Sequence, residues 1–180
     1  MSSLATRLGS LGAYRDLVAW CEPHGDDVTG ALAACPRGDW VIAIAIAEGA
    51  PHPDIVRAAC ACADLATELV EPAAIGAALR AVEAARAWAD TGAPLAADVV
   101  AACEELAGHP DPLVQSAAIA GLACALSVGD RREAPAAASG AVSAAALHAA
   151  ECGAMAAVAY THARTAELAR AALSGTATGG

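Results

Sequence analysis

Residues Ser139–Leu173 read SGAVSAAALHAAECGAMAAVAYTHARTAELARAAL, and 15 of these 35 residues are alanine. Alanine has the highest intrinsic helix propensity, and no proline interrupts the stretch. We therefore predict a long helix here, with a break near Gly153. The same bias extends over the whole chain, in which 55 of 180 residues are alanine and phenylalanine is absent. Since the β-branched and aromatic residues that favour sheets are scarce outside short runs, the sequence predicts an all-α fold.

Glycine and proline residues divide the rest of the chain into shorter predicted helices. These are Leu4–Trp20, a short helix capped by Asp26 or Asp27 and ending near Cys35, a helix from Trp40 to Gly49 capped by Asp39, and then Pro53–Val70, Pro72–Asp90, Leu95–Gly108 and Pro112–Val128. A turn is predicted at Pro23–Gly25 and a polar loop at Gly129–Pro135. The residues from Val41 to Ile46 also alternate as a strand does, but a lone strand would have no partner, so we predict a helix.

These elements predict one all-helical domain over residues 1–173, with a flexible tail over residues 174–180. We expect either a compact, alanine-rich helical bundle or a short array of antiparallel helix pairs. The second arrangement is favoured by a weak internal repeat: His52–Ala59 (HPDIVRAA) is similar to His109–Ala118 (HPDPLVQSAA). Stacked helix pairs of this kind occur in HEAT-type repeats.

Charge and composition exclude several classes of function. The net charge is −10 and the isoelectric point is about 4.7, which argues against nucleic-acid binding because phosphate neutralisation needs clustered lysine and arginine. All ten basic residues are arginine, so chemistry that depends on a lysine is excluded. The chain has no glycine-rich phosphate loop and no Glu-x-x-His pair. We therefore predict a protein that is not an enzyme and that has no cofactor.

The cysteines and the termini bear on location. Seven cysteines lie mostly within alanine-rich stretches, where cysteine acts as a small buried hydrophobic residue and indicates a reducing compartment. The first residues, Met1–Gly12, do not resemble a secretory signal. The most apolar run, Trp40–Ala47, is too short to cross a membrane. We expect a cytoplasmic protein.

Two groups of histidine and cysteine residues were considered as metal ligands. His148 and Cys152 are four residues apart on one helix face, and Met155 and His162 continue that face, although His162 lies about 20 Å from His148 along the helix axis. The spacing permits joint ligation by His148 and Cys152, and the alternative is a core stripe.

The second group is Cys21, His24 and Cys35. It lacks the fourth ligand that a structural zinc site needs, so we predict buried thiols and a histidine in a turn. Cys60 and Cys62 point about 200° apart on a helix, which prevents them from sharing a metal.

Bulky and acidic residues have simpler interpretations. Trp20, Trp40 and Trp88 are expected to fill gaps between helices that alanine lets approach closely, although tryptophan is also frequent in binding surfaces. The adjacent acidic pairs Asp26–Asp27 and Glu104–Glu105 are expected to be caps and surface charges.

Three runs of sequence resemble a known family. They are Cys35–Trp40 (CPRGDW) followed by an apolar helix and Gly49, Arg57–Ala63 (RAACACA), and Ala85–Gly92 (ARAWADTG). Together with the residues between them and onward to Leu173, they are similar to bacterial immunity proteins of polymorphic toxin systems, the immunity-protein-5-like group. The resemblance implies an all-helical protein that binds and neutralises a toxin, without catalytic residues.

The sequence therefore predicts a non-enzymatic interaction protein, and specifically an immunity protein with a protein partner, whose acidic surface would face a basic toxin. Two alternatives stay open. One is a short HEAT-like helical-repeat scaffold or assembly subunit, and the other is a metal- or ligand-binding bundle that uses His148 and Cys152. The sequence assigns no catalytic, cofactor-binding or metal-binding residue, and it leaves the partner-binding residues and the oligomeric state undetermined.

Overall fold

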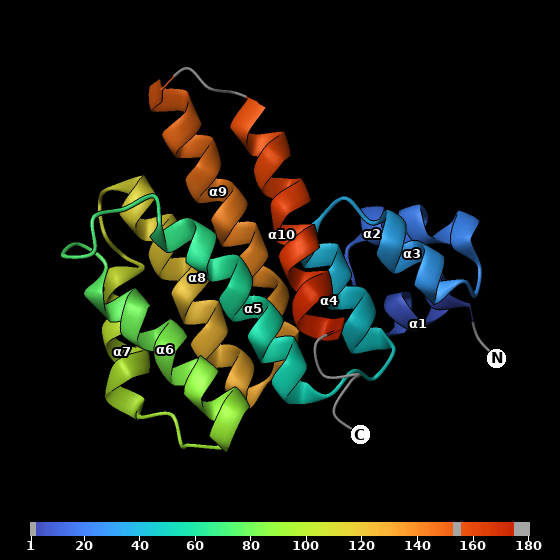
Figure 1. Cartoon of the computed structure of the whole chain (residues 1–180), viewed down its shortest axis with the longest axis horizontal. Helices are drawn as coiled ribbons and strands as arrows, with labels where there is room; N and C mark the ends of the chain where they lie inside the picture. The colour runs from blue at the N-terminus through green and yellow to red at the C-terminus, as the bar shows by residue number, and fades with distance from the viewer. Residues whose placement is uncertain (1–2, 153–155, 175–180) are drawn as a thin grey trace.

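A computed structural model of the chain describes residues 3–152 and 156–174, and these residues form ten α-helices and no strands (Figure 1). The helices are α1 (Leu4–Ser10), α2 (Arg15–Cys21), α3 (Val28–Ala34), α4 (Gly38–Ala47), α5 (His52–Thr67), α6 (Gly76–Thr91), α7 (Ala97–Leu106), α8 (Pro112–Gly129), α9 (Ala134–Cys152) and α10 (Ala156–Ser174). Two short 3-10 helices, η1 (Glu22–His24) and η2 (Arg131–Glu133), link neighbouring α-helices. The all-α prediction is confirmed.

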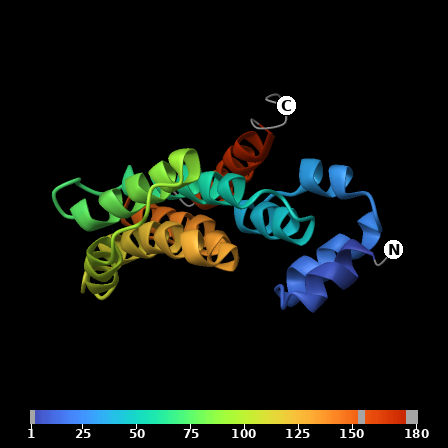
Figure 2. The same ribbon diagram turned by 90° about the horizontal axis from the view of Figure 1, so that it is seen from below.

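Helix α5 lies at the centre of the packing, in contact with α4, α6, α8, α9 and α10. Figure 2 shows α5 and α6 in one layer above α7, α8 and α9, while α1 to α3 lie at the other end of the molecule. Helix α10 packs against α4, α5 and α9. Two architectures were open from the sequence, a compact bundle and an array of antiparallel helix pairs. The observed arrangement is the compact bundle.

The internal repeat marks the start of two helices, α5 and α8, but its two copies are used differently. A ring nitrogen of His52 lies 2.7 Å from the carbonyl oxygen of Ser127 on α8. His109 instead accepts the backbone N–H of Asp111, two residues further along its own loop. The described helices form no curved stack of helix pairs, since α5 is enclosed by its neighbours.

Small residues set the spacing between helices in the core. A Cβ at Gly121 on α8 would lie 2.9 Å from the carbonyl oxygen of Ala78 on α6. A Cβ at Gly140 on α9 would lie 2.9 Å from the Cβ of Ala120 on α8. Since real Cβ atoms do not approach other atoms so closely, these helices are in contact almost backbone to backbone.

The prediction of one helix over Leu4–Trp20 is wrong, because the chain turns back between α1 and α2. Gly12 adopts a φ of +74°, a left-handed conformation that glycine tolerates and that ends α1. The predicted turn at Pro23–Gly25 is confirmed as η1, and Gly25 follows it with a φ of +56°. The predicted cap is also confirmed, since the Asp27 carboxylate accepts the N–H of Gly30 at the start of α3.

Helix α4 confirms the choice of helix over strand for residues 41–46, but its start differs from the prediction. It begins at Gly38, and Asp39 is not its cap. The Asp39 side chain is buried in the first turn, where it accepts two hydrogen bonds from the guanidinium of Arg37, at 3.1 and 2.7 Å. Burial requires a charged partner for this carboxylate, which explains why it turns toward Arg37 and not toward the helix end.

Three other boundaries also differ. Helix α6 starts at Gly76 and not at Pro72, and it ends as predicted at Gly92, whose φ is +73°. The loop predicted from Gly129 to Pro135 is mostly helical, since it contains η2 and the first residues of α9, which begins at Ala134 and not at Ser139. The first residue of the predicted tail, Ser174, is helical and ends α10, so the prediction is wrong at this residue. Gly153, the site of the predicted break, and residues 175–180, the rest of the tail, lie outside the described residues.

Helix α8 is long and apolar enough to cross a membrane by length and composition, the one such helix in the described part of the chain. More than half of α8 is buried, and it contacts α5, α6, α7 and α9. A buried core helix can have the same apolar composition as a membrane-spanning helix. Because α8 packs against four other helices, we interpret it as a core helix.

Candidate functional site

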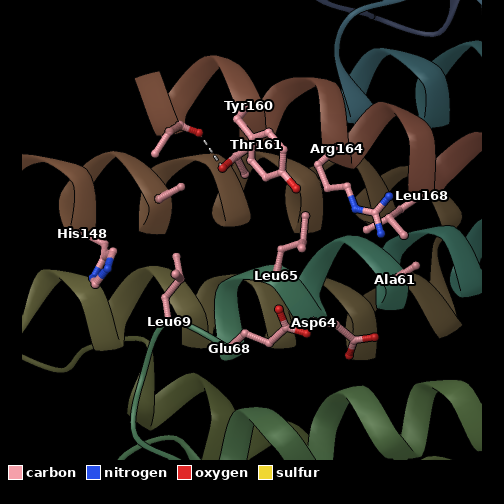
Figure 3. A pocket seen from close by; sticks show the side chains of 12 residues that line it. Ala61, Asp64, Leu65, Glu68, Leu69, His148, Tyr160, Thr161, Arg164 and Leu168 are labelled. Carbon is pink, nitrogen blue, oxygen red and sulfur yellow. Dashed lines mark hydrogen bonds between the residues drawn. The ribbon is translucent and has the colours of Figure 1, made fainter. Parts of the chain in front are cut away.

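A groove of about 520 Å³ lies between α5, α9 and α10, and we call it the α5–α10 groove (Figure 3). Its lining residues come from these helices and from the chain just after α5: Ala61, Asp64, Leu65, Glu68, Leu69, Ala145, His148, Ala157, Tyr160, Thr161, Arg164 and Leu168. The volume lies in the range of ligand-binding pockets.

The groove exists because α10 contacts α5 near Thr165 and lies farther from it near Tyr160. At Thr165, which is buried, the carbonyl oxygen of α10 accepts a hydrogen bond from the thiol of Cys62 on α5. Just over one helical turn earlier, Tyr160 is 69% exposed. Alanines at 145 and 157 leave the space between the helices open, because neither side chain can bridge it.

The two walls of the groove differ in chemistry. The α5 wall provides the carboxylates of Asp64 and Glu68, and the α10 wall provides Tyr160 and Arg164 (Figure 3). The Asp64 carboxylate accepts hydrogen bonds from Arg86 of α6, at 2.8 and 3.0 Å.

On the opposite wall, a guanidinium nitrogen of Arg164 lies 3.0 Å from a carboxylate oxygen of Glu167, three residues further along α10. Glu68 is exposed and forms no ion pair with the described residues. The groove therefore has an acidic wall in which one carboxylate, that of Glu68, forms no ion pair with the described residues.

Between these walls the floor is apolar. Leu65 and Leu69 from α5 and its C-terminal end, and Leu168 from α10, are half-buried. Such side chains still expose part of their surface to water, so covering them would be favourable. The groove can therefore accept a ligand that is apolar on one side and positively charged at its edge.

The structure places the predicted candidate His148 in the wall of this groove, on α9. The side chain of Cys152 and residues 153–155, including Met155, lie outside the described residues. No group of three or more histidine, cysteine, aspartate or glutamate side chains with the geometry of a metal site occurs in the described part of the chain.

His162, which follows on the same predicted face, does not line the groove. Its Nδ1 atom is buried and has no hydrogen-bond partner among the residues that the structure describes. Burial lowers the pKa of His162, and Arg37 lowers it further, while Asp39 acts in the opposite direction. The two histidines of the stripe therefore have different surroundings.

The six cysteines whose side chains the structure describes are buried, as predicted. The Cys60 thiol donates to the carbonyl oxygen of Val82 on α6, whereas the Cys62 thiol donates to Thr165 on α10. The two thiols thus point to different helices, and the prediction that they do not converge is confirmed.

Cys21 and Cys35 are also buried, and the His24 ring lies 4.6 Å from the ring of Trp20. Burial raises the pKa of the Cys62 thiol to about 12 and that of Cys35 to about 11.

The tryptophan prediction is confirmed for Trp40, which is buried, and only in part for the other two. Trp20 and Trp88 are half-buried and pack against the core. The rings of Trp20 and Trp40 lie 5.7 Å apart, and the Arg37 guanidinium lies over Trp40, 4.7 Å from the ring centre. Trp88 packs edge-on to His52 at 4.9 Å.

The residues that give the groove its chemistry are not among those predicted from the sequence. Asp64 and Glu68 are four residues apart, as are Tyr160 and Arg164, so each pair lies on one helix face. This spacing was a signal that the sequence carried. The acidic pair Glu104–Glu105, which was singled out instead, is exposed on α7 as predicted.

The chain was compared with models of known protein families, with curated proteins and with solved structures. None of the three comparisons found a match.

Proposed function

We propose that this chain is a non-enzymatic interaction protein, and specifically an immunity protein that binds a bacterial toxin and neutralises it. The observation that carries the proposal is the distribution of charge. Residues 68–111 contain eight aspartates or glutamates and two arginines, so they carry −6 of the net charge of −10. On α7, the side chains of Asp98, Glu104 and Glu105 are exposed and form no ion pair with the described residues.

The arginines reinforce this charge asymmetry. Six of the ten are in ion pairs with acidic residues of the same chain, namely Arg7, Arg37, Arg57, Arg86, Arg132 and Arg164. Arg170 donates to the backbone oxygens of Leu32 and Cys35. Most positive charge is thus used internally, which leaves an acidic exterior that complements a basic partner and speeds its association.

The similarity of three sequence runs to immunity proteins supports a toxin as that partner. In this proposal the protein acts by covering the toxin's functional surface, and its own side chains carry out no reaction. The alternatives of a repeat scaffold and of a metal-binding bundle stay predictions, and we propose neither, because no feature of the described residues favours them over partner binding.

The test is to mix the full-length chain with purified toxin domains encoded beside its gene. We expect one of them to form a complex on size-exclusion chromatography, to lose its toxicity, and to bind more weakly as the salt concentration rises. A charge-reversed chain with Glu104 and Glu105 changed to arginine should associate more slowly, because steering depends on the acidic surface. If no neighbouring toxin binds or is neutralised, the proposal is wrong.

A further inference from the structure

We propose that the α5–α10 groove receives an amphipathic helix of the protein partner, with a lysine or arginine of that helix paired to Glu68 and Asp64. This inference rests on the proposed function, since it assigns the surface with which the partner is bound. It is argued from the shape of the groove, its apolar floor, Tyr160 and the charge of its α5 wall.

The shape of the groove favours a helical occupant. Its two walls are the helices α5 and α10, and α9 lies behind them (Figure 3). Helices pack against each other by fitting rows of side chains into the grooves of their neighbours. A further helix laid between α5 and α10 would contact both in this way, which is a common mode of peptide recognition.

The floor and the rim of the groove provide apolar contacts. Leu65, Leu69 and Leu168 form the half-buried floor described above. Tyr160 stands at the rim with 69% of its surface exposed, so its ring is free to pack against a partner. Tyrosine is frequent among the residues that contribute most to binding, because it buries a large rigid ring and keeps a polar hydroxyl.

The charge of the groove selects a basic occupant. Glu68 has no ion-pair partner among the described residues, and the side chain of Asp64 stays 45% exposed although it contacts Arg86. The one arginine in the groove, Arg164, is engaged by Glu167. Asp64 and Glu68 lie one helical turn apart, so basic residues one turn apart on the partner helix can each reach one of them.

The experiment uses the full-length chain and two labelled probe peptides. One is an amphipathic helix of leucine and lysine, and the other has the same pattern with glutamate in place of lysine. Binding is measured by fluorescence anisotropy and located by the amide chemical shifts of the protein. We expect the leucine–lysine peptide to bind saturably, with shifts concentrated near Leu65, Leu69 and Tyr160, and the leucine–glutamate peptide to bind at least about tenfold more weakly.

Two matched pairs of variants test the assigned residues. Tyr160→Ala should weaken binding of the leucine–lysine peptide about tenfold, while Tyr14→Ala should change it less than about twofold. Tyr14 is a close control because it is 67% exposed and directly precedes α2, which lies at the other end of the molecule (Figure 1). Likewise, Glu68→Arg should weaken binding far more than Glu83→Arg, which reverses an exposed charge on α6.

The inference is overturned if the leucine–lysine peptide does not bind, if its shifts map to another surface such as α7, or if both peptides bind equally well. It is also overturned if the variants of each pair behave alike. These outcomes are separate from the toxin test. If the chain binds a toxin but not with this groove, the inference is wrong and the proposed function is supported. If the peptide binds in the groove but no toxin forms a complex, the groove binds basic helices and the proposed function is wrong.

Discussion

Gly38 and Thr165 bring α4 and α10 into direct contact: a Cβ at residue 38 would lie 2.6 Å from the Cβ of Thr165 and 2.7 Å from its backbone carbonyl carbon. Neither atom belongs to the end of a flexible side chain, so neither can move aside at little cost. The closeness of α4 to α10 therefore depends on glycine at position 38.

We expect Gly38→Ala to lower the free energy of unfolding by about 1–3 kcal/mol, the usual cost of overfilling a packed core. Urea denaturation of the variant measures this. Gly9→Ala is the control, since Gly9 also lies in a helix but no atom lies within 4 Å of its added Cβ. That variant should be as stable as the original chain or slightly more stable. If both variants lost the same stability, the close contact between residue 38 and Thr165 would be contradicted.

Arg57 joins α5 to α6. Its guanidinium donates to the carboxylate of Asp54 at 2.8 Å, to that of Asp90 at 2.9 Å, and to the carbonyl oxygen of Ala89 at 2.6 Å. Since the Asp54 side chain is only 5% exposed, Arg57→Ala removes a cation from beside a buried carboxylate. We expect a loss of about 2 kcal/mol in the free energy of unfolding, measured by denaturant titration.

Two further variants distinguish this network from simple loss of charge. Arg57→Lys should recover only part of the stability, because an ammonium cannot reproduce the fork of a guanidinium. Arg132→Ala removes an arginine that is 70% exposed and bonded to Asp130, so it should leave stability unchanged within error. A similar loss for Arg57→Ala and Arg132→Ala would argue against the network.

His162 should make the fold sensitive to acid. Burial, and secondarily Arg37, lower its pKa in the folded protein, with Asp39 opposing them, whereas in the unfolded chain its pKa is about 6.5. The unfolded state therefore binds the proton more readily, and stability contributed by neutral His162 is lost as the pH falls below about 6.5. We expect the free energy of unfolding to decrease between pH 7 and pH 5.

Replacing His162 with glutamine should reduce this slope, because the side chain at position 162 then no longer titrates. His109→Gln is the control, since His109 is exposed. Denaturant titrations at several pH values compare the three chains. A slope that is identical in the original chain and in His162→Gln would show that other groups cause the acid sensitivity.

The buried cysteines should resist alkylation in the folded protein. Burial raises the pKa of Cys103 to about 11 and that of Cys62 to about 12, so at pH 8 both thiols stay protonated and unreactive. We expect iodoacetamide to label these two residues only after denaturation, as followed by mass spectrometry of peptides. Rapid labelling of either one in native conditions would indicate that its helix opens or packs differently.

Local sequence signals predicted most of the helices, because alanine, proline and glycine act within one turn of the chain. They failed between α1 and α2 for a physical reason. Leu8 and Leu17 are both buried, yet nine residues on one straight helix would place them on opposite faces. The hairpin that Gly12 permits brings both leucines to the core, and this advantage outweighs the continuity of one helix.

The groove was less predictable than the helices. Asp64 and Tyr160 are almost a hundred residues apart, and nothing local to either residue specifies that α5 and α10 meet. The sequence pattern marks His148 as a possible metal ligand or a core residue and not as part of this groove, because the helical pattern shows which residues share a face and not which helix that face meets. The separation of α10 from α5 near Tyr160 depends on packing around Thr165, which is a property of the whole bundle.

The contacts of Gly121 with Ala78 and of Gly140 with Ala120 have a consequence for how this protein can change over time. In a core of large side chains, a bulkier residue at one position can be offset by a smaller one opposite. Here a Cβ at either glycine would also meet backbone atoms of the facing residue, the carbonyl oxygen of Ala78 and the amide nitrogen of Ala120, which no substitution removes. Related chains should therefore keep glycine at positions 121 and 140, whichever small residue stands opposite.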